Sequence, residues 1–416
     1  MFTCLQGGGG CVTRFPRGRK PTHPCDGVGV RGIYHNSCAQ LLIFSAKYFM
    51  MIPMKHFCRR WLVTAWIAVV AVCCVCAGCC VGCRATASVR TLYGLGAVLK
   101  LVAYEGMDEW AAHAAEVMAE VTRAVDVEDP TSDLARLNAA AVGEEVIVGE
   151  LLNEMLATAD TAYALTEGGY NAAAYWTVDL WGFSTRDKNA QNARSYDRVD
   201  GLPSEEYIAA FAALSSPAMW RRTEGGAWVK TGSVTLSDVT YTPAWDLGGL
   251  AKGWVVRRLV VAAADLGITR GYVSFGQSSV ALLANGKERD WDLSLRHPRG
   301  QEGQTFCTIP TRNRALATSG DYENYFEWQG KRYCHLIDTT TGRPIDNGIR
   351  SVTVLGEDAA MCDALATGLA VKGLDFIRAF VQGDYCAAHH VDVVVVYGPE
   401  DALQCFTTLD GLRTAL

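Results

Sequence analysis

The part of the chain that follows Cys83 contains few cysteines. Eleven of the sixteen cysteines lie at or before that residue, and the other five are widely separated along the remaining sequence. Disulfide frameworks and zinc sites use closely spaced cysteines in recognisable patterns, and no such pattern is present here. The sequence therefore argues against a disulfide-stabilised scaffold and against a zinc site in this part of the chain.

Basic residues are also scarce there. Residues 84–416 contain 29 Lys and Arg against 43 Asp and Glu, which is a formal net charge of −14. Proteins that bind nucleic acid present clustered positive charge to the phosphate backbone. The acidic balance of this region therefore argues against nucleic acid as a partner.

Residues 89–416 also lack an internal repeat and a low-complexity linker, so we expect a single domain in one or two lobes. Helical periodicity is present in "DEWAAHAAEVMAEVTRAV" and "LLNEMLATADTAYALTEGG", and strand-like runs include "RSVTVLG" and "VDVVVVYG". Since strands do not alternate strictly with helices, an α+β fold is the simplest interpretation.

One long run near the N-terminus lacks charge. Residues Trp61 to Val81 carry no charged side chain over 21 positions and follow three basic residues, a pattern typical of a signal peptide or a membrane anchor. The stretch "CAGC" resembles a bacterial lipobox and makes Cys79 the candidate for lipidation, with Cys83 as the second candidate. An uncleaved transmembrane helix and a plain secretory signal are the alternatives. In each case the pattern predicts export.

The first 53 residues precede a second possible start, Met54, and are rich in Gly, Pro and Cys without periodicity. We interpret residues 1–53 as an unstructured upstream extension and residues 54–83 as a signal peptide or lipoprotein signal. Residues 89–416 then form the exported domain.

Residues 361–373, "MCDALATGLAVKG", read as an apolar helix with one carboxylate in it. Positions four apart share a helix face, so Asp363 and Thr367 can point to the same place. A buried carboxylate needs compensation, and two oxygen ligands without Cys or His suit a hard ion such as magnesium. The alternative is that Asp363 pairs with an Arg or caps a neighbouring backbone. The pair alone leaves both interpretations open.

The segment "WDLGGLAKGWVVRRL" places Asp246 before a glycine pair, then Lys252, then a helix. Glycines allow the backbone to approach a ligand, a helix start favours anionic groups, and Lys supplies a charge for phosphate. The spacing matches neither a Walker loop nor the GxGxxG fingerprint, so a structural loop-to-helix cap is the alternative.

Two further segments have unusual chemistry for their positions. In "KRYCHLIDTTTGRPI", His335 is either a satisfied core residue or a general base for a substrate hydroxyl. In "GGYNAAAYWTVDLWGF", the aromatic residues, Trp181 and Phe183 among them, form either core or a wall against a flat apolar ring.

Taken in chain order, seven segments closely resemble the FAD:protein FMN transferases, the ApbE-type flavin transferase family of bacterial periplasmic lipoproteins. The segments are "PTSDLARLN", "GGYNAAAYWTVDLWGF", "WDLGGLAKGW", "WDLSLRHP", "LATSGDYENYF", "YCHLIDTTTGRPI" and "CDALATGLAVKG". The resemblance implies an α+β flavin-transferase domain that cleaves FAD, links FMN through a phosphoester to a Thr or Ser of a target flavoprotein, and releases AMP.

The resemblance also implies residue roles. Asp363, Thr367 and the carbonyl of Gly249 would bind magnesium, and His335 would be the base. The FAD site would be formed by residues from three segments: Trp181, Gly182, Phe183, Asp246, Lys252 and Ile337. By the same resemblance, the protein would be anchored by a lipid on the periplasmic side of the inner membrane.

The sequence departs from the family pattern at four places. "GQS", Gly276 to Ser278, stands where "GGN" or "GGD" is usual, and Thr339 replaces a common Pro. The usual Met of the first strand and the aromatic before "S-x-L" are also absent, which predicts a looser adenine pocket. Two other functions remain open: a magnesium-dependent FAD pyrophosphatase that gives FMN and AMP, and a lipoprotein that binds FAD without chemistry.

Overall fold

The computed structural model describes Thr3–Cys4 and residues 86–184, 198–283, 291–301, 303–311 and 313–414. Its largest element is an eight-stranded sheet in which every pair of neighbours is antiparallel. In spatial order the strands are β2 (Ser88–Gly94), β3 (Ala97–Ala103), β10 (Gly271–Phe275), β11 (Ser279–Leu283), β14 (Ala315–Gly320), β19 (Ile349–Gly356), β20 (Asp392–Tyr397) and β21 (Gln404–Thr407).

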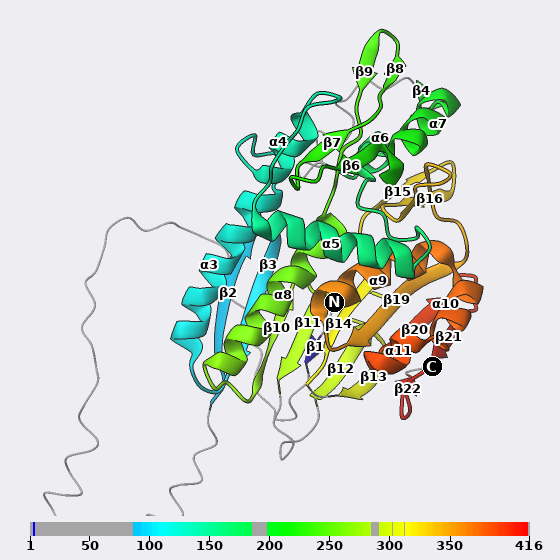
Figure 1. The fold of residues 1–416 in the computed structure, drawn as a ribbon. Helices are drawn as coiled ribbons and strands as arrows, with labels where there is room; N and C mark the ends of the chain where they lie inside the picture. The colour runs from blue at the N-terminus through cyan, green and yellow to red at the C-terminus, as the bar shows by residue number, and fades with distance from the viewer. Residues whose placement is uncertain are drawn as a thin grey trace, which may run out of the picture. The chain divides into compact units, whose positions relative to one another are not determined.

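Helices cover one face of this sheet (Figure 1). They are α3 (Met107–Val125), α5 (Glu150–Leu165), α8 (Gly248–Asp265), α9 (Ala359–Lys372), α10 (Leu374–Phe380) and α11 (Asp384–Ala388). α9 is buried over almost its whole length, which explains why its sequence is apolar on all sides. α8 packs directly against α9, and the two helices together carry the candidate site described below.

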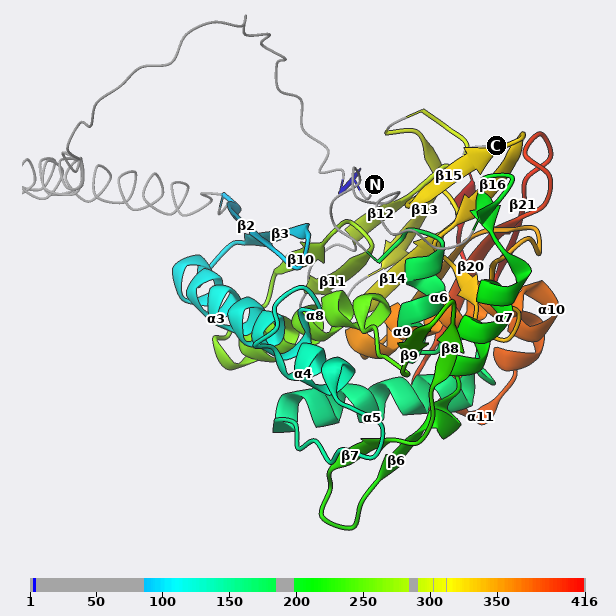
Figure 2. The same ribbon diagram turned by 90° about the horizontal axis from the view of Figure 1, so that it is seen from above.

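A second, four-stranded sheet packs on the opposite face (Figure 2). Its order is β1 (Thr3–Cys4), β12 (Trp291–Arg296), β13 (Thr305–Thr311) and β22 (Arg413–Thr414). The alternation along β20 shows the two layers: Val393 and Val395 join the core under the helices, whereas Val394 and Val396 join the core between the sheets. Strand side chains point alternately to opposite faces, so a continuous valine run is what a strand buried on both sides requires.

The remaining elements are short and lie mostly at one end of the helical layer (Figure 1). A third core joins α6, α7 and Ile337. The elements are α4 (Asp133–Ala139), α6 (Tyr175–Leu180), α7 (Glu205–Leu214), the 3-10 helix η1 (Pro217–Met219), β4 (Arg198–Val199), β5 (Leu202–Pro203), β6 (Trp220–Arg222), β7 (Trp228–Lys230), β8 (Val234–Leu236), β9 (Val239–Tyr241), β15 (Tyr325–Trp328), β16 (Lys331–Cys334), β17 (Ile337–Asp338) and β18 (Arg343–Pro344).

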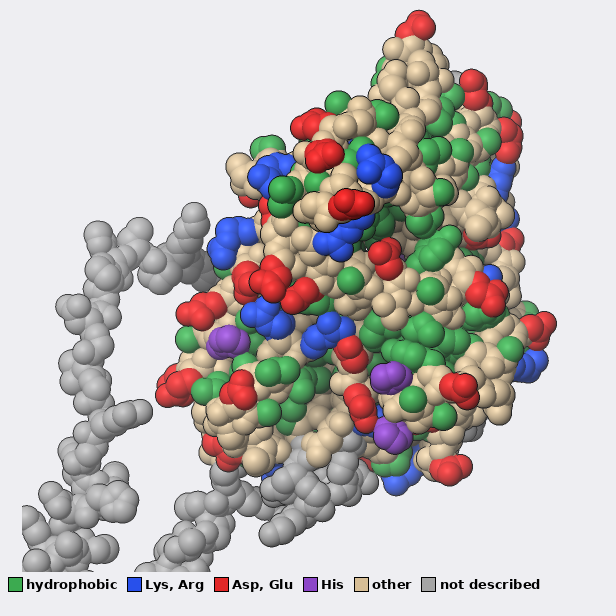
Figure 3. All heavy atoms as spheres, in the orientation of Figure 1, with side chains coloured by type: hydrophobic (Ala, Val, Ile, Leu, Met, Phe, Trp, Pro, Cys, Tyr) green, Lys and Arg blue, Asp and Glu red, His purple; other side chains and the backbone are tan. Residues whose placement is uncertain are grey.

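The α+β interpretation is confirmed. The two helical patterns correspond to α3 and α5, and the two strand-like runs correspond to β19 and β20. The five cysteines after Cys83 are all free, as their spacing predicted. On the face drawn in Figure 3, acidic and basic side chains are interspersed rather than separated into patches.

The predictions for the N-terminal region concern residues that the structure does not describe. Of residues 1–53 it describes only the short strand β1, and the uncharged run and Cys79 lie outside the described residues. Within the described part of the chain, no helix is long and apolar enough to cross a membrane.

Candidate active site

A cavity of about 260 Å³ lies between the start of α8, the middle of α9 and the segment around His335. It brings together residues that are far apart in the sequence. Eight of the predicted site residues line it: Phe183, Asp246, Gly249, Lys252, His335, Ile337, Asp363 and Thr367. The structure thus brings eight predicted residues from separate segments to one cavity, and their roles there remain predictions.

Asp363 is buried in the wall of this cavity, with 4 % of its surface exposed. Its carboxylate accepts hydrogen bonds from the backbone N–H of Gly253 (2.9 Å) and from the hydroxyl of Ser279 (3.0 Å). A Cβ atom at Gly253 would lie 2.4 Å from the carbonyl oxygen of Ala359, so glycine is what allows α8 to approach α9 this closely. The backbone-capping alternative is therefore correct in part.

The Arg-pairing alternative is wrong within the described residues, because no Arg or Lys lies within ion-pair distance of Asp363 there. Both of its hydrogen-bond donors are neutral groups. Burial raises the pKa of Asp363, and the nearby charge of Lys252 opposes that rise. The negative charge of the Asp363 carboxylate is therefore only partly compensated by the described protein.

Thr367 lies one helical turn after Asp363, as the spacing predicted. Its hydroxyl is 3.0 Å from the hydroxyl of Ser319, and a Cβ atom at Gly249 would lie 3.5 Å from Thr367 Oγ1. One carboxylate, two hydroxyls and the first turn of α8 thus meet at one edge of the cavity. This oxygen donor set would suit a hard cation. Among the described residues there is no cluster of three or more His, Cys, Asp or Glu that could hold a metal ion by itself.

Lys252, in the first turns of α8, lies near three carboxyl groups. Burial raises the pKa values of Asp246, Glu323 and Asp363, and the Lys252 ammonium opposes the rise in all three. Asp246 Oδ1 accepts a hydrogen bond from the backbone N–H of Gly248 (2.7 Å), and Lys252 Nζ donates to the carbonyl oxygen of Gly248 (3.2 Å). Asp246 therefore does cap the loop before the helix, and its carboxylate also faces the cavity.

His335 is held in one tautomer by the backbone. The backbone N–H of His335 donates to the carbonyl oxygen of Asn324 (2.9 Å), and the ring Nδ1 lies 3.2 Å from the same oxygen. A carbonyl oxygen can only accept, so Nδ1 carries the proton of the neutral ring and Nε2 keeps its lone pair. Burial lowers the pKa of His335 to about 4, and the charge of Lys252 contributes to this shift. The ring is therefore neutral at pH 7 and can accept a proton.

The aromatic segment is divided between the core and the cavity. Trp181 is 3 % exposed, donates its indole N–H to the carbonyl oxygen of Gly342 (2.8 Å) and stacks on Tyr333 at a centroid distance of 5.5 Å. Neither Trp181 nor Gly182 lines the cavity, whereas Phe183 does and packs edge-on against His335. Contact of Trp181 and Gly182 with a flavin remains a prediction.

Twelve of the twenty residues that line the cavity were not among the predicted site residues, and three of these twelve are Tyr170, Ser319 and Asn324. Each lies in a segment that carried the resemblance, but its type alone did not indicate a role. Tyr170 is 3 % exposed, and its hydroxyl has no hydrogen-bond partner among the described residues. Asn324 acts through its backbone carbonyl, which no sequence pattern can report.

The "GQS" departure forms the turn between β10 and β11. Residues 276–278 connect the paired residues Phe275 and Ser279, and Gly276 and Gln277 in this three-residue connection both have positive φ values, 59° and 62°. A Cβ atom at Gly276 would lie 3.2 Å from Lys252 Cδ, so this turn packs against the lysine of the site. Gln277 takes a backbone conformation that favours glycine.

Comparison with known proteins shows the family of this chain. The profile of the ApbE family matches residues 91–390, which is most of the chain. The chain belongs to the ApbE family. The resemblance that the seven segments indicated is thereby confirmed.

Two curated relatives of this chain are named FAD:protein FMN transferase. The protein of Vibrio cholerae is 30% identical over 276 residues, which cover 66% of this chain and 75% of the relative. That of Escherichia coli K12 is 26% identical over 299 residues, which cover 68% and 78%.

Solved ApbE structures share the fold. The flavin transferase ApbE from Vibrio cholerae superimposes with a TM-score of 0.62 at 25% identity, covering 77% of this chain and 97% of that one. The apbe protein from Thermotoga maritima gives a TM-score of 0.63 at 25% identity, covering 77% and 96%. The prediction of a single ApbE-like domain is therefore confirmed.

Proposed function

We propose that this protein transfers FMN from FAD to a Thr or Ser hydroxyl of a target flavoprotein and releases AMP. The observation that carries the proposal is the meeting of a neutral His335, Lys252 and the Asp363–Thr367 pair around one cavity. The names of the family relatives support the same activity. Phosphoryl transfer depends mainly on positioning and charge neutralisation, and these side chains provide both.

The residues in the cavity fit magnesium as the metal. Asp363, Thr367 and the carbonyl of Gly249 would hold the ion, as the buried carboxylate with only neutral donors and the adjoining hydroxyls indicate. When bound, magnesium supplies positive charge to the phosphate oxygens. Among the described residues Asp363 has no ion-pair partner, and the metal would be one.

In the proposed reaction, Lys252 orients and neutralises the pyrophosphate of FAD. His335 Nε2 takes the proton from the acceptor hydroxyl, while Nδ1 remains bonded to the Asn324 carbonyl. The acceptor oxygen forms a bond to the phosphorus of the FMN half, and the bond between that phosphorus and the bridging oxygen breaks. The bridging oxygen and its electron pair leave with AMP.

We also propose that the protein is exported and anchored by a lipid at Cys79, on the periplasmic side of the inner membrane. The uncharged run and the "CAGC" stretch support this proposal. Metabolic labelling with a fatty acid, compared between wild type and Cys79→Ser, tests it: loss of label in the variant supports lipidation at Cys79. Retained label that is lost in Cys83→Ser would move the anchor to Cys83.

The activity is tested with the full chain in detergent, incubated with FAD and magnesium, with and without an acceptor domain that bears a Thr motif. A mass gain of one FMN on the acceptor with matching AMP supports the transferase. AMP and free FMN without acceptor indicate the pyrophosphatase, in which water replaces the hydroxyl. FAD that stays intact in both tubes indicates a binding protein. His335→Ala should bind FAD and lose AMP release, by about a hundredfold or more.

A further inference from the structure

The segment that delivers Asp246 to the cavity is held by a side chain distant in the sequence. The side-chain amide of Asn138 on α4 bonds both backbone polar groups of Trp245: Oδ1 accepts from the N–H (2.8 Å) and Nδ2 donates to the carbonyl oxygen (2.8 Å). The amide thus bonds the backbone of Trp245, the residue before Asp246, in the way that a neighbouring strand would. No pattern in the segment around Asp246 indicates this contact, because the two residues are 107 positions apart.

A buried lysine supports Asn138 from behind. Lys230 on β7 is 1 % exposed, and its Nζ donates to the backbone carbonyl of Asn138 (2.5 Å) and to the hydroxyl of Thr242 (2.8 Å). Its ammonium also lies 5.6 Å from the ring centroid of Trp220. Lys230 therefore joins α4 to the start of the Thr242–Asp246 segment.

The same segment is fixed on its other side. The indole N–H of Trp176 donates to the carbonyl oxygen of Thr242 (2.6 Å), and the N–H of Asp246 donates to the carbonyl oxygen of Ala172 (2.7 Å). Thr242, Trp245 and Asp246 are thus each bonded to other parts of the chain. Asp246 is the last residue of this fixed segment, and it lines the cavity.

We propose that Asn138, supported by Lys230, is the positioning residue for Asp246, and that FAD binding and turnover depend on it. The inference rests on the proposed function, because it assumes that the cavity takes FAD. A group held by a rigid frame loses efficiency steeply when it is displaced, and a shift of about 1 Å can cost about a hundredfold in rate. Asn138 touches neither the cavity nor a reacting atom, so it acts through Asp246.

The test compares two asparagines that make similar bonds. Asn153 on α5 also donates to backbone carbonyls and accepts from the indole of Trp228, but it does not line the cavity and does not bond the Thr242–Asp246 segment. We expect Asn138→Ala and Asn153→Ala to lower the melting temperature of the full chain to a similar extent. FAD affinity, measured by flavin fluorescence with and without magnesium, and kcat/KM for AMP release should fall about tenfold or more only in Asn138→Ala.

A double-mutant cycle with Asp246→Asn shows whether Asn138 acts through Asp246. If it does, Asn138→Ala adds little to the loss already present in Asp246→Asn. Additive losses of FAD affinity would overturn the inference, as would an Asn138→Ala protein with wild-type affinity and kcat/KM. If Asn138→Ala does not fold, Asn138→Asp serves instead: it still accepts from the Trp245 N–H but cannot donate to the carbonyl, and the same cycle applies.

The controls separate this inference from the proposed function. A wild-type protein that neither binds FAD nor releases AMP would overturn both. A wild-type protein that is active, together with an unaffected Asn138→Ala, would overturn the positioning role alone.

Discussion

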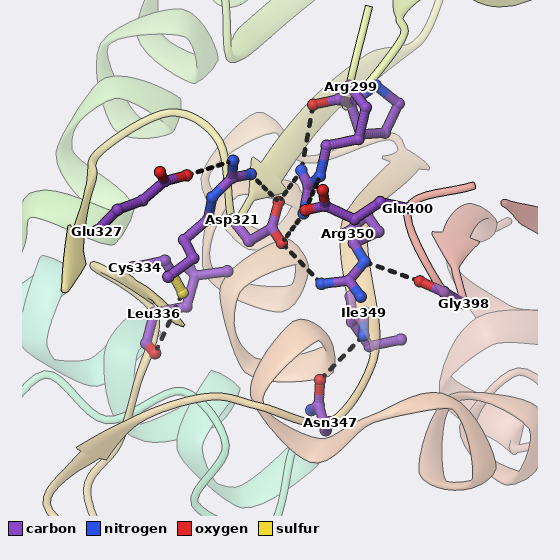
Figure 4. A network of polar contacts seen from close by, with 12 residues as sticks. Arg299, Asp321, Glu327, Cys334, Leu336, Asn347, Ile349, Arg350, Gly398 and Glu400 are labelled. Carbon is purple, nitrogen blue, oxygen red and sulfur yellow. Dashed lines mark hydrogen bonds and ion pairs between the residues drawn. The ribbon is translucent and has the colours of Figure 1, made fainter. Parts of the chain in front are cut away.

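Asp363 and Asp321 are buried to nearly the same extent, 4 % and 5 % exposed, but their surroundings are opposite. Asp321 accepts a bidentate pair of hydrogen bonds from Arg299 (2.8 and 2.6 Å) and another from Arg350 (3.2 Å), and Figure 4 shows both guanidinium groups converging on it. Asp363 receives only neutral donors. Burial of a carboxylate therefore does not identify a functional site, whereas incomplete charge compensation does.

The largest expected effect is on stability at the compensated carboxylate. Asp321→Ala leaves the two guanidinium groups of Arg299 and Arg350 without their buried partner, which should cost about 3–5 kcal/mol in the free energy of unfolding. Urea denaturation followed by tryptophan fluorescence measures this. A loss below about 1 kcal/mol would show that the network does not compensate Asp321 in the way that the distances indicate.

The uncompensated carboxylate should respond in the opposite direction. Its folded-state pKa is raised above the unfolded value, so the charged form destabilises the fold at pH 7, and Asp363→Asn should keep or increase the stability of the magnesium-free protein. Magnesium at about 100 times its Kd should stabilise the wild type by about 2.7 kcal/mol and leave the variant unchanged.

Activity provides the contrasting measurement for the same variant. Under the proposed function, AMP release by Asp363→Asn should fall by about a hundredfold or more, because the metal ion would lose its charged ligand. A variant that is destabilised like Asp321→Ala, or that retains the magnesium response, would remove the distinction between the two carboxylates.

The pH dependence of stability gives a further test of the site, through the titration of His335. Because burial lowers the pKa of His335 to about 4, the ring should titrate near pH 4 in NMR spectra of the free protein, with His335→Ala identifying the resonance. The unfolded chain takes up this proton near pH 6.5, so stability should decrease as the pH falls from about 6.5 to about 4. A titration near 6.5 would mean that the ring is solvated and that the cavity is more open than its lining indicates.

The local parts of this site were predictable from the sequence, and the long-range parts were not. The helical period alone placed Thr367 beside Asp363, and the apolar character of the segment indicated burial of α9. The charge environment of Asp363 depended on Ser279 and Gly253, which belong to other elements. In the same way, the stacking of Trp181 on Tyr333 joins two segments that only the tertiary fold brings together.

The smallest expected effect concerns the turn that packs on Lys252, the residue whose charge opposes the pKa rise of Asp363. Gln277 has a φ of 62°, which costs an L-residue about 1–2 kcal/mol, whereas glycine loses about 0.5–1 kcal/mol through its greater unfolded-state freedom. Gln277→Gly should therefore raise the free energy of unfolding by about 0.5 kcal/mol, and Gln277→Ala, which keeps the strain, should not. If the site depends on the charge of Lys252 rather than on the side chain at position 277, both variants keep wild-type kcat/KM. A fall in kcat/KM for Gln277→Ala alone would instead assign the glutamine side chain a part in the site.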